Sequence, residues 1–128
     1  NDEILKRAID SILSKNLSEI EILVVGNTNL KIPGVVFIPF DETIKKSWIT
    51  KKKNLIATNA KGKVLVIMHD YFEISNSWTN QSLRALAAKN FEVAMCRIEN
   101  IDGKRFRDCF YPIITNCTSD IYEADDYL

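Results

Sequence analysis

The sequence predicts an α/β fold in which a mostly parallel sheet is flanked by helices. Stretches with helical periodicity alternate along the chain with short apolar runs of strand length. These runs are apolar on both faces, which is typical of strands that helices cover on both sides. The composition, 46% hydrophobic and 27% charged, is that of a folded protein. With 128 residues, we predict a single domain over residues 1–128.

A first helix is predicted near the start of the chain, because apolar side chains recur at helical spacing over residues 4–13. Asp2 is expected to cap this helix, which should end near Asn16. A strand follows over residues 19–25, and a second strand is predicted over residues 35–38. A polar loop with a Pro-Gly turn separates the two strands.

A second helix is predicted over residues 43–60, because Gly62 stands just beyond its end. Apolar and aromatic side chains recur along this stretch and predict one buried face. The expected core contacts are Ile44, Trp48, Ile49, Leu55 and Ile56.

The remaining elements continue the alternation. We predict a buried strand at residues 64–68, a helix at 78–88 and a strand at 91–98. A turn at residues 100–103 should start a hairpin that reaches residue 111. The chain opens on a helix that needs a sheet to pack against, so we expect a further strand before it. The domain is therefore expected to be incomplete at one or both ends.

Composition narrows the function classes. Seventeen basic and seventeen acidic side chains cancel, whereas nucleic-acid binders carry a basic excess, so no nucleic-acid partner is expected. No apolar run approaches the ~20 residues of a membrane span. Three cysteines, Cys96, Cys109 and Cys117, show no CxxC spacing and suit free thiols in a reducing compartment. A cytoplasmic protein is predicted.

The chemical candidates are His69 and Asp70, at the carboxyl end of the predicted strand at residues 64–68. In open α/β sheets, ligands bind outside the carboxyl ends of the strands. A carboxylate there can coordinate a divalent cation, which in turn can neutralise a diphosphate. The alternative is that Asp70 begins a turn or caps the next helix, and that His69 is a half-buried structural side chain.

Five stretches share an order with a known family: 5–13, Glu21-Ile-Leu-Val-Val25, Lys53-Asn54, Ala60-Lys61-Gly62 and His69-Asp70-Tyr71. This order resembles the family-2 glycosyltransferases with the GT-A fold. Those proteins have a helix, an E-I-x-V-V strand, an R/K-N pair, an A-K-G turn and a strand ending in a D-x-D-like motif. The H-D-Y form, with Trp48 and Trp78, is similar to a bacterial subgroup. The resemblance covers most of residues 4–100.

The resemblance implies an enzyme that moves a sugar from a nucleoside diphosphate sugar to an acceptor hydroxyl. It implies an inverting, metal-dependent reaction in bacterial surface polysaccharide synthesis, with a glycan or lipid-linked acceptor. Asp70 would bind the divalent metal, Mn²⁺ or Mg²⁺, and the donor diphosphate; His69 would be a second ligand. Tyr71 would contact the acceptor or a sugar ring. Lys52, Lys53 and Asn54 would face the nucleotide.

The sequence also departs from the family pattern. Gly26 and Asn27 stand where an acidic residue usually reads the nucleotide base, so the base stays open. The general base is unassigned; Asp108 is a weak candidate, and the late acidic cluster of Glu123, Asp125 and Asp126 suits a surface tail. Two alternatives remain. One is a non-catalytic GT-A-like module that binds a nucleotide or a glycan, and the other is an unrelated α/β nucleotide-binding domain.

Overall fold

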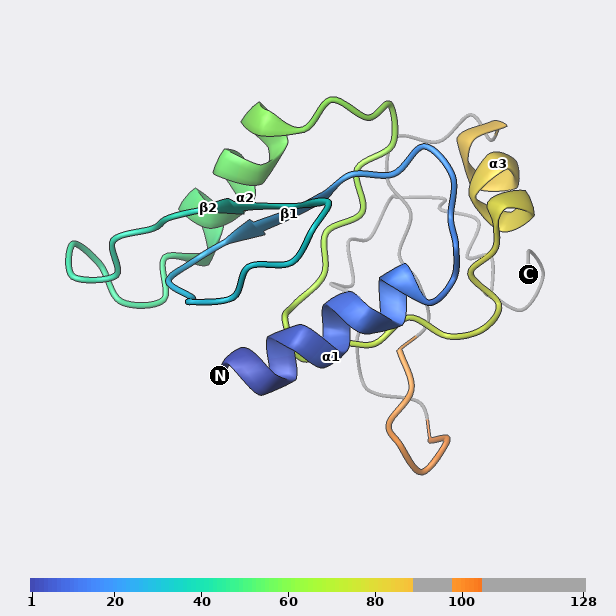
Figure 1. Cartoon of the computed structure of the whole chain (residues 1–128), viewed down its shortest axis with the longest axis horizontal. Helices are drawn as coiled ribbons and strands as arrows, with labels where there is room; N and C mark the ends of the chain where they lie inside the picture. The colour runs from blue at the N-terminus through green and yellow to red at the C-terminus, as the bar shows by residue number, and fades with distance from the viewer. Residues whose placement is uncertain (89–97, 105–128) are drawn as a thin grey trace, which may run out of the picture. The chain divides into compact units, whose positions relative to one another are not determined.

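The computed structural model describes residues 1–88 and 98–104. The chain divides into two compact units, residues 1–88 and residues 89–128. The first unit holds all the helices and strands described below (Figure 1). They are α1 (Asp2–Leu13), β1 (Ile22–Val25), β2 (Val35–Ile38), α2 (Ile49–Asn59) and α3 (Asn80–Ala88). The prediction of an α/β fold is confirmed at this level.

In the second unit the structure describes one turn, at residues 98–104. The Gly103 N–H donates to the Asn100 carbonyl oxygen at 2.9 Å, and the Asn100 N–H donates to the Lys104 carbonyl oxygen at 2.8 Å. Gly103 has a φ of +77°, which favours glycine. This confirms the predicted turn. The predicted strand at 91–98 and the hairpin to residue 111 fall almost entirely outside the described residues.

Helix α1 begins at Asp2, directly after a capping asparagine. The Asn1 side chain accepts a hydrogen bond from the Glu3 N–H at 3.0 Å and so caps the helix. The expectation that Asp2 is the cap was therefore wrong. Ala8 and Ile9 form the buried stripe of the helix, with 4% and 2% of their surfaces exposed. Helix α1 ends at Leu13, slightly before the predicted end.

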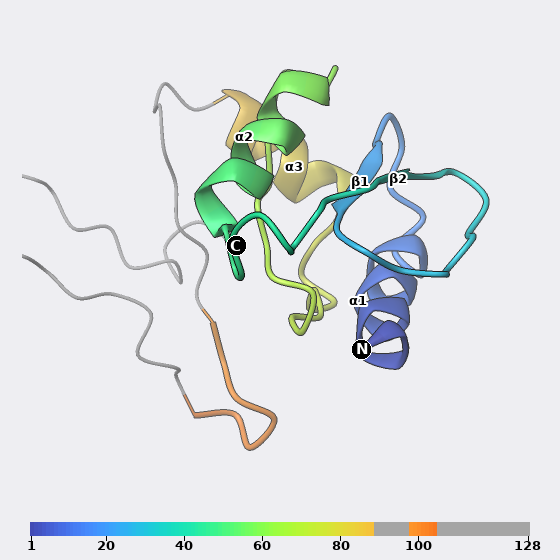
Figure 2. The same ribbon diagram turned by 90° about the vertical axis from the view of Figure 1, so that its left-hand side faces the viewer.

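Strands β1 and β2 pair in parallel, as the α/β prediction requires. Ile22 pairs with Val35 at one end and Val25 with Ile38 at the other. The Gly26 N–H donates to the Ile38 carbonyl oxygen at 3.0 Å and extends the ladder past the end of β1. Figures 1 and 2 show α1 on one side of this strand pair and α2 on the other. The two strands therefore end at the same edge, which positions the pocket described below.

Helix α2 begins at Ile49 and not at residue 43, so the predicted start was wrong. Glu42 is the reason, because its carboxylate accepts the Ser47 N–H at 3.1 Å and pairs with the Lys52 ammonium. Ser47 has a φ of +55°, outside the helical region. Side-chain bonds to nearby backbone groups compete with helix formation, and here they produce a compact loop over residues 42–48.

The late start of α2 changes which side chains are buried. Ile44 is 74% exposed and Ile49 is 46% exposed, so both were wrongly expected in the core. Trp48, Leu55 and Ile56 are half-buried. The helix therefore packs with its second half and leaves the apolar side chains around its start in solvent.

Residues 64–68 do not form the buried strand that was predicted. The side chains of Val64, Leu65, Val66 and Ile67 are each 42–49% exposed, and no described residue pairs with this segment as a strand. Its start is held by Glu21, whose carboxylate accepts the N–H groups of Lys61 and Gly62. An apolar run of this length predicts burial only where a partner covers it.

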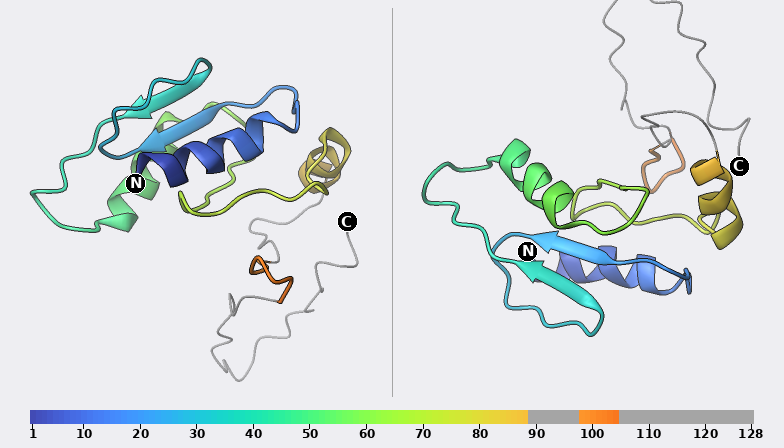
Figure 3. Two further views of the ribbon diagram at one scale, coloured as in Figure 1. Left: turned by 60° about the horizontal axis from the view of Figure 1, so that its bottom comes forward. Right: turned by 90° about the horizontal axis from the view of Figure 1, so that it is seen from above.

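The segment at residues 73–79, which leads into α3, lies beside α1, as two views show (Figures 1 and 3). The contacts that hold it are Arg7 to Glu73, Ser11 to Ile74, Lys15 to Asn76, and Ser18 to Asn80. The residue numbers of both partners rise from one contact to the next, so residues 7–18 and residues 73–80 run in the same direction. Helix α3 then starts at Asn80, two residues later than predicted. Among the described residues, no helix combines the length and apolarity needed to cross a bilayer.

The exposure of residues 64–67 predicts that a charge is tolerated there. We expect Val66→Lys to change the free energy of unfolding by about 0.5 kcal/mol or less, as surface substitutions do. Ile22→Lys is the matched comparison, because Ile22 in β1 is only 9% exposed. We expect this substitution to lower the free energy of unfolding by about 4 kcal/mol. Urea unfolding followed by tryptophan fluorescence measures both. An equal loss at the two positions would show that Val66 is buried in the folded protein.

Candidate functional site

The predicted donor site forms a tight turn. The Phe72 N–H donates to the His69 carbonyl oxygen at 3.2 Å, which places Asp70 and Tyr71 at the corners of a β-turn. Asp70 and Tyr71 are exposed and His69 is half-buried. Asp70 therefore begins a turn, as the alternative interpretation held, and it does not follow a buried strand.

Three rings of this turn pack on one another. The imidazole of His69 stacks on Tyr71 with 5.1 Å between ring centroids and 9° between planes. Phe72 meets both rings edge-on, at 5.8 Å from His69 and 4.7 Å from Tyr71. Offset and edge-on contacts of this kind stabilise a ring arrangement by about 1 kcal/mol. They hold the imidazole and the phenol against each other within the turn.

The Asp70 carboxylate makes no hydrogen bond or ion pair with any residue that the structure describes, so it is available to a ligand. Glu73, the next acidic residue, pairs with Arg7. Within residues 1–88 and 98–104, no three His, Cys, Asp or Glu side chains gather as a metal site. His69 and Asp70 could supply two ligands to Mn²⁺ or Mg²⁺, and the rest would have to come from a diphosphate and water.

Lys52, Lys53 and Asn54 lie on α2. The Lys52 ammonium pairs with Glu42 and lies 5.3 Å from the Phe40 ring. That pair lowers the pKa of the Glu42 carboxyl below its usual value, mainly through the hydrogen bond from Lys52. Lys52 is thus held beside the residues that follow β2. Lys53 and Asn54 are exposed, and none of the described contacts joins them to the His69–Phe72 turn.

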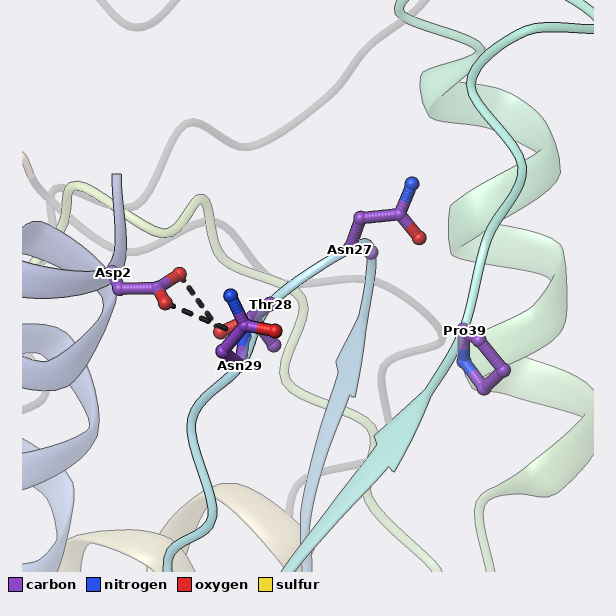
Figure 4. Close-up of a pocket in the computed structure, with 6 residues that line it drawn as sticks. Asp2, Asn27, Thr28, Asn29 and Pro39 are labelled. Atoms are coloured by element: carbon purple, nitrogen blue, oxygen red, sulfur yellow. Dashed lines mark hydrogen bonds between the residues drawn. The ribbon is translucent and has the colours of Figure 1, made fainter.

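A polar pocket lies at the edge of the sheet where β1 and β2 both end. It is open and has a volume of ≈ 350 Å³ (Figure 4). Its lining residues are Asp2, Gly26, Asn27, Thr28, Asn29 and Pro39. The Asp2 carboxylate accepts the Thr28 hydroxyl at 2.8 Å and the Asn29 N–H at 3.3 Å, and so ties the loop after β1 to α1.

The sequence pointed to this pocket only in part. Gly26 and Asn27 were noted as a departure from the family pattern, and Thr28 and Asn29 were not singled out. A polar run directly after the first of two parallel strands is the signal that could have found them, because ligands bind at such edges. The contact of Asp2 has no local signal, since its partners lie 26 and 27 residues away. The amide and hydroxyl groups suit a neutral polar ligand, such as a base or a sugar.

Helix α1 contacts both the pocket loop and the segment that follows the His69–Phe72 turn. Asp2 holds the pocket loop, and Arg7, five residues later, holds Glu73 just after the turn. Five helical residues rise by about 7.5 Å. The pocket loop and the His69–Phe72 turn are therefore anchored to the same half of α1.

Asp108 and the acidic cluster of Glu123, Asp125 and Asp126 lie outside the described residues, as do the three cysteines. We therefore identify no described residue as the general base that the resemblance implies.

Comparisons of the chain with protein-family models, with curated proteins and with solved structures found no match.

Proposed function

We propose that the chain is part or all of a GT-A-like glycosyltransferase that uses a nucleoside diphosphate sugar. The observation that carries the proposal is the exposed Asp70 carboxylate, which has no partner among the described residues. It stands beside His69 on a turn anchored to the same half of α1 as the polar pocket. The order of motifs supports it. The same proposal places the protein in the cytoplasm, in bacterial surface polysaccharide synthesis, with a glycan or lipid-linked acceptor.

In this proposal the nucleotide sugar contacts both the polar pocket and the His69–Phe72 turn. The amide and hydroxyl groups of Asn27 and Thr28 would hold the base or ribose in the pocket. Asp70 and His69 would hold Mn²⁺ or Mg²⁺, which stabilises the negative charge of the departing diphosphate. Tyr71, 60% exposed, would contact the acceptor or the sugar ring. Lys53 and Asn54, exposed on α2, would contact the nucleotide.

A second candidate is a module that binds a nucleotide or a glycan without turnover. The specific observation in its favour is the donor set of the turn, which offers one free carboxylate and one imidazole. No third ligand joins them among the residues that the structure describes.

Nucleotide release separates the two candidates. The protein is incubated with UDP-, GDP-, CMP- and dTDP-sugars and Mn²⁺, with a glycan acceptor present or absent. We expect metal-dependent release by the unmodified protein, and a loss of about 100-fold or more in Asp70→Asn, because a carboxylate on the metal is removed.

Asp10→Asn is the control, since Asp10 is an exposed carboxylate on α1 that pairs only with Lys6 among the described residues. Its release rate should equal that of the unmodified protein. Nucleotide binding without release would favour the module. Absence of binding to every nucleotide and to the glycan would contradict both candidates.

A further inference from the structure

The charge of the chain is unevenly distributed. Its net charge is zero, yet residues 43–63 contain seven lysines and no acidic residue. The lysines are Lys45, Lys46, Lys51, Lys52, Lys53, Lys61 and Lys63. A local field of this kind attracts anionic partners even when the whole protein is neutral.

Three of these lysines surround the start of α2 and have no acidic partner among the described residues. Lys45, Lys46 and Lys51 are exposed, and none of them pairs with a described carboxylate. The Lys45 ammonium lies 5.3 Å from the Trp48 ring. Two carboxylates stand just before this stretch: Glu42 pairs with Lys52, and Asp41 accepts the N–H and the hydroxyl of Thr43. Neither forms an ion pair with the three lysines, which therefore keep their charges exposed to solvent.

Two isoleucines stand among these charges. Ile44, directly before Lys45, is 74% exposed, and Ile49, the first residue of α2, is 46% exposed. The bonds of Glu42 to Ser47 and Lys52 hold the loop that carries Ile44 against α2, which begins with Ile49. Two large exposed apolar side chains, close in sequence to lysines without a described acidic partner, give this part of the chain a mixed apolar and cationic character.

We propose that Ile44, Lys45, Lys46, Ile49 and Lys51, here named the lysine–isoleucine surface, dock on an anionic membrane surface. Lysines near such a surface are attracted to anionic headgroups, while apolar side chains insert at the boundary of headgroups and acyl chains. Trp48 lies between the two isoleucines in sequence and is of the type that prefers this boundary. Nucleic acid would use the lysines alone and leave the isoleucines in water. None of the five residues belongs to the proposed donor site, so the inference stands independently of the proposed function.

Vesicle binding tests this surface with the full chain. The chain has two tryptophans, so Trp78→Phe leaves Trp48 as the only fluorescent one. Titration with vesicles of phosphatidylglycerol and phosphatidylcholine should shift Trp48 emission to the blue, and phosphatidylcholine alone should not. In the same background, Lys45→Gln with Lys46→Gln should weaken binding roughly 30-fold, since each lysine contributes about fivefold. Ile44→Ser with Ile49→Ser should weaken it about tenfold.

The pair Lys31→Gln with Lys104→Gln is the matched control, because it removes the same charge from exposed positions elsewhere and should leave binding within about twofold. Far-UV circular dichroism shows that each variant is folded. Absence of binding to anionic vesicles at low salt would overturn the proposal. It would also be overturned if the isoleucine pair had no effect and duplex DNA displaced the vesicles, because the surface would then be a simple polyanion site.

Discussion

Ile9→Ala is expected to lower the free energy of unfolding by about 3 kcal/mol, the largest loss we expect from truncating one side chain to alanine in the described part of the chain. Ile9 is 2% exposed and is the largest fully buried side chain in the part that the structure describes. The buried apolar residues described there are only Ala8, Ile9, Ile22 and Phe40. Few other contacts can compensate, and a domain with a small core has a small margin of stability. Urea unfolding followed by far-UV circular dichroism measures the loss.

Ile4→Ala is the control for this prediction. It removes the same atoms from the same helix, but Ile4 is 41% exposed. We expect a loss of about 1 kcal/mol or less, because less apolar surface returns to water and no closed cavity forms. Similar losses at both positions would mean that α1 does not carry the core of the first unit.

The elements that sequence patterns predicted are those whose neighbours lie close in the chain. Helix α1 repeats apolar residues at helical spacing, and β1 and β2 are apolar runs on either side of a Pro-Gly turn. Their parallel pairing agrees with the predicted sheet, although a loop and not a helix joins them. Each of these elements also has a partner within the described residues, so the inference from pattern to burial holds.

The errors arise where a distant or side-chain partner decides the outcome. Residues 64–68 have strand composition, but no described strand pairs with them. The start of α2 is delayed by the bonds of Glu42 to Ser47 and Lys52, which periodicity does not register. Ile44 and Ile49 become exposed as a consequence. Patterns of apolar residues describe what a segment can bury, and not whether a surface is there to cover it.

The candidate site was predictable to a similar degree. His69, Asp70 and Tyr71 were singled out from the order of motifs in the chain. In the structure the rings of His69 and Tyr71 stack, and the side chain of Asp70 is exposed. The pocket after β1 was missed because its completion depends on Asp2, whose role was assigned to helix capping. Once Asn1 takes the cap, the Asp2 carboxylate is free to reach Thr28 and Asn29.

Asp2→Ala should therefore cost more than an acidic residue at a helix start usually does. We expect a loss of about 2 kcal/mol in the free energy of unfolding. The substitution removes a charged acceptor from the Thr28 hydroxyl and the Asn29 N–H, each worth about 0.5–1 kcal/mol at this partial exposure. It also removes a favourable charge from the first turn of α1, worth about 0.5 kcal/mol. Thermal and urea unfolding give the total.

Glu3→Ala separates the two causes, because Glu3 carries the same charge in the same turn and its side chain contacts no part of the loop among the described residues. Its loss should be about 0.5 kcal/mol, the helix-dipole contribution alone. In Asp2→Ala, and not in Glu3→Ala, amide hydrogen exchange should accelerate at Asn29 and at Leu30, whose N–H donates to the Thr28 hydroxyl oxygen at 3.1 Å. Nucleotide binding should weaken in parallel if the pocket loop contacts the ligand. Equal effects of the two substitutions on exchange would show that Asp2 acts through the helix and does not hold the pocket.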